Sequence, residues 1–415
     1  MKQRFYQFIA ITIAIIVCWG VAIAPAQAET VPLTLDILQQ RLDNPVLREG
    51  SFAIDLEDFS IDLREENPEF RDRFYELLRD RLAKANNSLG LDLSGAIVRG
   101  MFDGTKLGLR TPLYGEALSP LFSAEEKAQI DRDRDRLSRL QQLSQSLVFD
   151  PKFGNSNLRL TVIRGMLTLD GAQFVDAVNF ANTFFLDRVD AKNTLFSGVS
   201  NFSETRFSKG ANFIGASFTE KANFQSSIFF DEASFDLARF RAEIKFGNVN
   251  FQDTASFHQA QFDDLANFSR SRWQENGDFS QTIWDGKAVF NKANFSKTLF
   301  LTDTQFNESA TFRQAKLREA IDLQRSSISN VIDFSDLVFA NSATLNVSGL
   351  TFDSEVAQIA GDPGNIGKRI SVSSLQGNEN LLRKLVRNFR DLEQISDANA
   401  IDYLEAKLRS RYLDR

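Results

Sequence analysis

The sequence predicts a mainly β solenoid with four sides, about 22 residues per coil and α-helical flanking regions. Large apolar residues recur at alternating steps of five and six residues, without a slip, from Leu158 to Leu350. Of these 36 marked positions Phe holds 24, Trp273 and Trp284 hold two, and Leu, Ile or Ala191 hold the rest. Self-similarity at a fixed period over so many residues is typical of a solenoid.

Steps of five and six residues fit neither a continuous α-helix nor a straight β-strand. Five residues on an α-helix advance by about 140°, so neighbouring marked residues would face apart. An eleven-residue repeat can wind a helical supercoil, but the intervening Asn, Ser, Thr and Asp are weak helix formers. On a straight strand a step of five places consecutive marked residues on opposite faces. We therefore expect the chain to bend between marked residues, with each one pointing inward from one side of a coil.

The columns of the repeat predict the number of sides. Two Phe would overfill a coil of eleven residues, whereas a coil of twice that length gives four sides and one unbroken Phe column. We call each marked residue a centre and the residue two positions before it a flank. The flanks are small or apolar, and a large centre beside a small flank fills a square cross-section. In the Phe column, an Asn precedes the Phe in several coils. These Asn side chains are predicted to stack as an amide ladder, which Lys245 interrupts. The Phe column is Phe180, Phe202, Phe224, Phe246, Phe268, Phe290, Phe312 and Phe334, and the Asn ladder is Asn179, Asn201, Asn223 and Asn267.

The triplets "ANF", "ASF" and "ARF" with a second marked residue five positions later resemble the pentapeptide-repeat proteins, in the Phe-rich form with paired repeats of eleven residues. The resemblance implies a right-handed quadrilateral β-helix. At about 4.8 Å per coil, it implies roughly nine coils and a rod of about 40 Å. Alternate steps contain a sixth residue that the simple family pattern lacks. This departure affects the expected geometry of the corners.

The N-terminus predicts export. Residues 1–28 have the form of a signal peptide, with Lys2 and Arg4 before an uncharged run from Phe8 to Ala24 and a small-x-small site at 26–28. The alternative is an uncleaved membrane anchor, although the run is short for a span of about 20 residues.

Residues 29–157 are expected to form a mixed α/β cap region, because a solenoid must cover its end coils. Within it, Asn67 and Pro68 predict the start of a helix with one apolar stripe, and residues 51–63 alternate as a strand or hairpin. Ser123 and Glu126 predict a capping box for a charged helix that extends to about Ser146. Residues 91–109 have the repeat spacing and are either an extra coil or part of the cap.

Residues 158–352 are the expected β-helix, 353–378 a linker and 379–415 a helical hairpin. The hairpin helices are expected at about 380–395 and 398–413, the second capped by Ser396 and Asp397. The hairpin resembles the tail of larger membrane pentapeptide-repeat proteins, in which transmembrane helices follow. It is expected either to cap the last coil or to dock a partner.

The sequence offers no catalytic, cofactor-binding or metal-ligating residues, and we expect neither an enzyme nor a bound cofactor. His258 is the one histidine and follows an inward Phe, which places it on the surface. Cys18 is the one cysteine and lies in the predicted signal, so the exported chain has no disulfide or thiolate chemistry. The stretch "DRDRDR" (131–136) begins like a calcium loop but has Arg136 where the loop needs Gly, so a solvated helix face is expected.

Charge argues against nucleic-acid partners. The chain has a net charge of −7, and an acidic protein is poorly suited to phosphate backbones. Some pentapeptide-repeat proteins confer quinolone resistance by imitating DNA and binding gyrase. Between residues 158 and 350, however, 22 acidic residues alternate with 19 basic ones, whereas a DNA mimic needs a continuous negative surface.

We therefore expect a structural or protein-binding rod with an unknown protein partner, exported to the periplasm or, in a photosynthetic bacterium, to the thylakoid lumen. The alternative is a membrane-associated regulatory or channel-accessory subunit, held by an uncleaved N-terminal segment or by the C-terminal hairpin. A DNA-mimic topoisomerase inhibitor is the remaining alternative.

Overall fold

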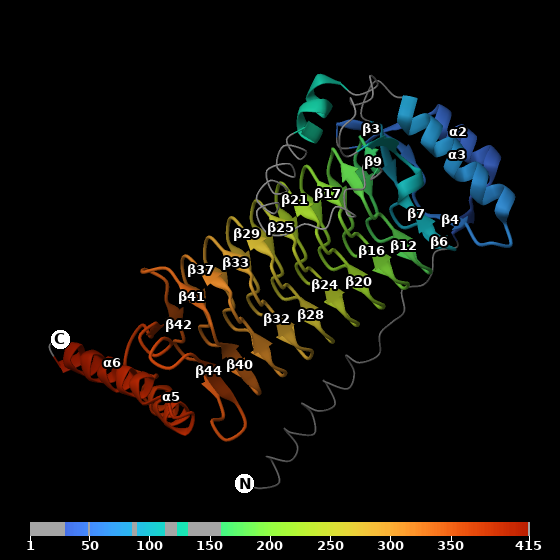
Figure 1. Ribbon diagram of the computed structural model, residues 1–415. Helices are drawn as coiled ribbons and strands as arrows, with labels where there is room; N and C mark the ends of the chain where they lie inside the picture. Colours follow the sequence, from blue (N-terminus) through green and yellow to red (C-terminus); the bar gives the residue numbers. More distant parts are fainter. Residues whose placement is uncertain (1–29, 49, 85–88, 113–122, 132–158, 414–415) are drawn as a thin grey trace, which may run out of the picture. The chain divides into compact units, whose positions relative to one another are not determined.

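The computed structural model describes residues 30–48, 50–84, 89–112, 123–131 and 159–413. Residues 32–415 cluster as one unit, which the chain enters through strand β1 (Val31–Pro32). The described strands of this unit form four sheets that are the sides of a solenoid (Figure 1). We name them side 1 to side 4 in the order in which the chain visits them.

Each side is a ladder of short strands, most of them two residues long. Side 1 consists of β2 (Val46–Arg48), β3 (Ser51–Asp55), β5 (Gly90–Asp92), β10 (Leu167–Thr168), β14 (Val189–Asp190), β18 (Ala211–Asn212), β22 (Ala233–Ser234), β26 (Ala255–Ser256), β30 (Gly277–Asp278), β34 (Leu299–Phe300), β38 (Ile321–Asp322), β42 (Leu345–Asn346) and β45 (Ile370–Ser371). Side 2 includes β4 (Phe59–Asp62), β6 (Ile97–Arg99), β11 (Gln173–Phe174), β15 (Leu195–Phe196), β19 (Ser217–Phe218), β23 (Arg239–Phe240), β27 (Gln261–Phe262), β31 (Ile283–Trp284), β35 (Gln305–Phe306), β39 (Ser327–Ile328) and β43 (Thr351–Phe352).

The other two sides have the same construction. Side 3 consists of β7 (Phe102–Asp103), β12 (Val178–Asn179), β16 (Ser200–Asn201), β20 (Ala222–Asn223), β24 (Ile244–Lys245), β28 (Ala266–Asn267), β32 (Ala288–Val289), β36 (Ala310–Thr311), β40 (Val331–Phe334) and β44 (Gln358–Gly361). Side 4 consists of β8 (Leu109–Pro112), β9 (Arg159–Ile163), β13 (Thr183–Phe185), β17 (Arg206–Phe207), β21 (Ile228–Phe229), β25 (Asn250–Phe251), β29 (Arg272–Trp273), β33 (Asn294–Phe295), β37 (Lys316–Leu317) and β41 (Val338–Phe339).

The predicted coil length is confirmed by the strand register. Along the repeats each strand pairs in parallel with the strand one predicted coil later, as Ala211 does with Ala233 and Phe207 with Phe229. Successive strands of one coil lie on successive sides, so each piece of five or six residues is one side of a square.

The predicted Phe column forms the middle of the core. Phe246 is fully buried and stacks between Phe224 and Phe268, with ring centroids 5.0 and 4.9 Å away. The ring of Phe235, in the neighbouring column, meets Phe246 edge-on at 5.3 Å and 82°. Aromatic rings favour stacked and edge-on contacts because of their quadrupoles. The ring–ring contacts therefore stabilise the core in addition to the burial of apolar surface.

Two kinds of corner alternate along the chain and explain the steps of five and six. In the five-residue step, the second residue after the centre adopts a left-handed conformation, as Leu237 (φ 59°) and Arg270 (φ 59°) do. Such residues recur every eleven positions through most of the repeat region, at 182, 193, 204, 215 and onward to 336. The corner in the six-residue step has one residue more, so the sixth residue belongs to a second type of corner within one solenoid.

The predicted register is wrong in the last coil. Leu345 pairs with Ile321 and Phe352 pairs with Ile328, so both lie two positions further along the chain than the earlier coils would place them. Two extra residues at the preceding corner shift the frame, so Val347 and Phe352 are the centres and the expected centres Leu345 and Leu350 are flanks. All of these residues are buried and apolar, and hydrophobicity therefore could not separate centre from flank.

Residues 91–109 form an additional coil, the alternative that the sequence left open. Strands β5, β6 and β7 pair in parallel with β10, β11 and β12, as in the pairing of Leu91 with Leu167. Strand β8 then closes side 4 by pairing antiparallel with β9. The solenoid thus begins before the interruption at residues 113–158.

Residues 51–63 are two sides of a further partial coil, and the expectation of one strand or a hairpin is corrected. Strand β3 pairs in parallel with β5, and β4 pairs in parallel with β6. The chain turns between them at Asp58, which has a φ of 60°. The hairpin of this region lies earlier, between β2 and β3.

Helices cover the N-terminal end. Helix α2 (Leu35–Asp43) packs on α3 (Pro68–Lys84), which starts at the predicted Pro68, and Phe74 and Leu78 of α3 are fully buried in the core. The short helix η1 (Gly104–Lys106) follows β7. The predicted capping box is present at the start of the helical residues 124–131, because Ser123 N–H donates to Glu126 Oε2 (2.6 Å) and Glu126 N–H donates to Ser123 Oγ (3.1 Å). The expected signal peptide and the rest of that helix lie outside the described residues.

The C-terminal region continues the solenoid further than expected. The predicted linker 353–378 contains β44 and β45, which add a strand to side 3 and to side 1. Helices α5 (Glu379–Asp391) and α6 (Ile395–Leu413) then form the expected hairpin. The predicted cap at Ser396 and Asp397 is wrong, because α6 starts at Ile395. Asp397 is instead buried, and its carboxylate accepts the backbone N–H groups of Gly364 and Gly367.

Candidate interaction surface

The outward side chains of the coils form a lattice. On each side the residues before and after the centre point away from the core, because side chains alternate along a strand. On side 3, for example, Phe268 is fully buried while Asn267 and Ser269 are partly exposed. Since the coils are in register, each outward residue lies beside its equivalent in the next coil. Apart from the first coils of side 4, where the outward Phe184, Leu186 and Ile228 are buried, the solenoid therefore presents straight columns of mostly polar groups at fixed spacing.

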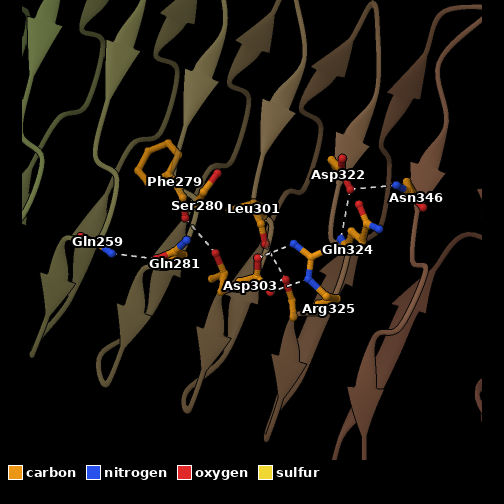
Figure 2. A network of polar contacts seen from close by, with 12 residues as sticks. Gln259, Phe279, Ser280, Gln281, Leu301, Asp303, Asp322, Gln324, Arg325 and Asn346 are labelled. Atoms are coloured by element: carbon orange, nitrogen blue, oxygen red, sulfur yellow. Dashed lines mark hydrogen bonds and ion pairs between the residues drawn. The ribbon is translucent and has the colours of Figure 1, made fainter.

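Figure 2 shows these columns near the corner between sides 1 and 2. Gln259 extends along the rod, and its Nε2 donates to Gln281 Oε1 at 2.7 Å. Two coils further on, Arg325 donates from Nε and Nη2 to the two oxygens of Asp303 at 2.7 and 2.6 Å. A bidentate guanidinium–carboxylate contact fixes both side chains, so this edge has a defined polar outline.

The Asn column forms, but the predicted amide ladder is replaced by local hydrogen bonds. Asn201 pairs in register with Asn223. The Oδ1 atoms of Asn201 and Asn223 accept the backbone N–H groups of Ser203 and Gln225, two residues further along the chain, at 3.1 and 2.9 Å. Asn and Asp readily bond their own backbone in this way, and these contacts stabilise the corner within each coil.

Several charges near these columns are paired across coils. Arg239 contacts Asp263 at 2.9 Å and Lys297 contacts Glu319 at 3.1 Å. The hydrogen bond from Arg325 holds the pKa of Asp303 below its usual value. This hydrogen bond keeps the Asp303 carboxylate charged and oriented at neutral pH.

Three carboxylates gather at the N-terminal end, but their counterions are arginines. Asp55, Glu57 and Asp92 place oxygens within 4.8 Å of one another. Arg48 contacts all three, and Arg41 contacts Asp55 at 2.8 Å. Burial lowers the pKa of Arg48, but the charges of these carboxylates outweigh that effect and raise it overall. The two guanidinium groups offset two of the three carboxylate charges and occupy the carboxylate oxygens, so the cluster fits ion pairs better than a metal ion.

A cleft of about 360 Å³ lies between α3 and the chain around η1. Tyr75 lines it, and the Tyr75 hydroxyl donates to Met101 O (3.2 Å) while accepting from Asp103 N–H (2.7 Å). Burial raises the pKa of Tyr75 above its usual value, so the hydroxyl stays protonated. Both contacts are to backbone groups at the edge strand β7, and the phenol therefore has a structural task.

The two ends of side 3 are closed in the same manner. At the C-terminal end, Asn388 of α5 accepts from Ile359 N–H (3.1 Å) and donates to Ile359 O (2.9 Å) on the edge strand β44. Unpaired strand edges invite pairing with other chains. One helix side chain at each end thus binds the edge backbone. The sequence pattern predicted neither role, although a polar Asn388 inside the apolar stripe of α5 is a signal that could have been noticed.

Buried hydroxyl groups are another feature that the repeat pattern did not predict. At several flank positions Ser or Thr replaces Ala, and Thr205 Oγ1 donates to Phe180 O of the preceding coil at 2.9 Å. Where Trp replaces Phe, the flank bonds the indole: Trp273 Nε1 donates to Ser271 Oγ and Trp284 Nε1 donates to Thr282 Oγ1, both at 2.8 Å. The pairing of Trp with a hydroxyl two residues earlier was visible in the sequence.

The singled-out His258 is partly buried on side 1. Its backbone N–H donates to Asp236 Oδ1 at 2.9 Å, and its place after Phe257 agrees with the expected outward position. The "DRDRDR" stretch lies outside the described residues beyond Asp131. The structure therefore brings no predicted site residues together, and the surface lattice is the candidate functional feature.

Comparison with known proteins identifies the repeat. Residues 191–239 match the family model for pentapeptide repeats, in nine copies. No curated protein and no solved structure was found to match the chain. The matched residues lie within a continuous run of coils that has the same four sides before and after them. The chain therefore contains pentapeptide repeats within a β-solenoid fold.

Proposed function

We propose that this protein is a non-enzymatic scaffold whose solenoid sides dock a protein partner. The observation that carries the proposal is the outward lattice, in which polar side chains are held at fixed spacing by coils that pair with one another. Solenoids commonly use such extended surfaces for recognition. A surface that is ordered before binding loses little entropy on association.

The arrangement of polar groups supports a role without catalysis. Buried hydroxyls such as that of Thr205 bond carbonyl groups of the preceding coil, and Arg41 and Arg48 contact the carboxylate cluster at Asp55. Tyr75 and Asn388 bind edge strands. These groups have structural partners, and several surface charges, such as Arg239 and Asp263, form cross-coil ion pairs.

Export to the periplasm or a thylakoid lumen is part of the proposal and rests on the sequence of residues 1–28. Membrane association is the competing localisation. None of the helices that the structure describes has the length and apolar character of a membrane span. The apolar residues Leu382, Leu385 and Phe389 of α5 are fully buried, which supports a capping role for the hairpin.

Affinity capture tests the proposal. The full chain with a C-terminal tag is expressed in its source cell, fixed with a short amine cross-linker, purified from the exported fraction and analysed by mass spectrometry against a tagged unrelated exported protein. We expect a protein enriched with this chain alone. Enrichment of the same proteins by both baits would contradict the scaffold role. Carbonate extraction of the membrane fraction then separates a soluble rod, which is released, from an anchored one, which is retained.

A further inference from the structure

One part of side 4 is cationic although the chain as a whole is acidic. In three successive coils, built on β29, β33 and β37, nine outward positions form a three-by-three grid. Five of these positions carry a positive charge, four are neutral and polar, and none is acidic. We call this grid the basic lattice. Its rows are Arg270, Arg272 and Gln274; Lys292, Asn294 and Ser296; and Gln314, Lys316 and Arg318.

The register brings these residues side by side. Arg272 pairs with Asn294, and Asn294 pairs with Lys316. With about 4.8 Å between coils and about 3.3 Å per residue along a strand, the grid measures roughly 10 Å along the rod and 13 Å across it. It is a small, flat surface of fixed spacing.

The cations of the basic lattice differ from the paired cations of the repeat region. Arg239, Lys297 and Arg325 each contact a carboxylate in an adjacent coil. The five lattice cations are exposed, and none of them forms an ion pair with a described residue. Exposed like charges repel one another, so the arrangement lowers stability unless a ligand neutralises it. Five exposed cations gathered on one small face, with no acidic residue among them and no ion pair to a described residue, indicate a binding surface.

The surroundings define the kind of ligand. The preceding coil has no charge at the equivalent positions, which hold Asn248, Gln252 and the buried Asn250, whereas acids lie at the neighbouring corner, among them the exposed Glu275. A broad anionic surface such as a bilayer would also meet these acids. A nucleic acid would be repelled by the net charge of −7. An extended acidic peptide needs only about four residues to cross the grid.

We infer that the basic lattice docks an acidic segment of the partner protein, in an extended conformation, with the lattice cations facing its carboxylates. This inference rests on the proposed scaffold function and specifies the chemistry of the partner. Exposed ion pairs of this kind are individually weak, so the contact is expected to depend on several cations at once and to weaken with salt.

The direct test measures binding of a fluorescein-labelled octaglutamate peptide by anisotropy at low salt. The lattice variant R272Q/K316Q/R318Q is compared with R241Q/K287Q/K368Q, which removes three other exposed cations and has the same net charge. None of these six residues forms an ion pair among the described residues, and unchanged melting curves verify folding. We expect the lattice variant to bind about tenfold more weakly than the parent and the control to match the parent. No binding by the parent, or an equal loss in both variants, would overturn the inference.

Two further arms decide the class of ligand. Phosphatidylglycerol vesicles and a single-stranded oligonucleotide replace the peptide, and tighter binding of either one, lost in the lattice variant, would overturn the acidic peptide. Affinity capture with the lattice variant separates this inference from the scaffold role. Loss of the captured partner supports the inference, whereas full retention of the partner overturns it and leaves the scaffold function standing.

Discussion

Each coil is determined by a few residues with distinct tasks. The centre fills the interior, the flank two positions earlier makes room for it, and the residue before the centre bonds its own corner, as Asn223 does to Gln225 N–H. The core has no disulfide to support it, so its stability depends on the packing of aromatic columns. Substitutions at centres and at corners should therefore have very different effects.

Phe246→Asp should abolish folding. Phe246 is fully buried between stacked rings, and an unpaired charge at that place has no compensating partner. Phe246→Leu is the control and should cost only about 1–2 kcal/mol, because it keeps an apolar side chain of moderate volume. Urea unfolding followed by circular dichroism measures both. A Phe246→Asp variant that melts like the parent would show that this residue does not point inward.

Leu237→Asn should raise the melting temperature. Leu237 is 57 % exposed and has a φ of 59°, a conformation that costs a non-glycine residue about 1–2 kcal/mol and that Asn tolerates better. Val175, also exposed, has no positive φ, so Val175→Asn serves as the control and should give no gain. Equal changes in the two variants would mean that the corner conformation is not the cause.

The edge strands are the elements most open to unwanted pairing, because a solenoid has open backbone groups at both ends. Asn388→Leu should destabilise the protein by about 1–3 kcal/mol, since Ile359 N–H and C=O lose their partner. It should also increase aggregation. The neighbouring exposed Arg387→Leu is the matched control. Thermal melting and light scattering measure both effects, and indistinguishable variants would contradict the capping role of Asn388.

The Asp303–Arg325 pair gives the edge between sides 1 and 2 a pH dependence. The pKa of Asp303 is lower in the folded state than in the unfolded state. The contribution of Asp303 to the free energy of unfolding is therefore fully present above its unfolded pKa of about 3.9, and it is lost as the pH falls through its folded pKa. Asp303→Asn should therefore be slightly less stable than the parent at pH 7 and equal to it near pH 2. Asp264→Asn, which removes an exposed carboxylate without an ion pair among the described residues, is the control. Urea unfolding at several pH values tests this, and a constant difference between parent and Asp303→Asn would contradict it.

The sequence predicts the elements of the repeat region well because every centre is apolar and all but Ala191 are large. It fails where that contrast disappears. In "LNVSGLTF", residues 345–352, flank and centre are both apolar, so a shift of two residues leaves no trace in the pattern. The partial coil at residues 51–63 has one short strand on each of two sides and no neighbour at the repeat spacing. Tyr75 and Asn388 could not be assigned either, because their tasks depend on strands distant in the sequence.

At the scale of the whole molecule, the described coils of the solenoid keep their register across an interruption in the sequence. Leu167 pairs with Leu91, although a long insertion separates them in the sequence. The coil formed by residues 90–112 is therefore joined to the repeats by contacts and not by sequence continuity. Spacing alone cannot reveal this, because residues 113–158 stand between the two parts.

Truncation at residue 158 should therefore expose β10, β11 and β12 as open edges, since they lose their partners β5, β6 and β7. Open edges favour association. We expect residues 159–415 alone to aggregate, whereas residues 29–415 stay monodisperse in gel filtration. A monodisperse fragment would contradict the extra coil.

The central claim is that the sides of the solenoid carry the function. A photo-crosslinking amino acid at Lys292 of side 4, with matched variants at exposed Arg241 of side 2 and exposed Tyr403 of α6, tests it in the source cell. We expect a cross-linked protein partner from Lys292 and none from Tyr403. Cross-links from Tyr403 alone would contradict the central claim and assign binding to the C-terminal hairpin.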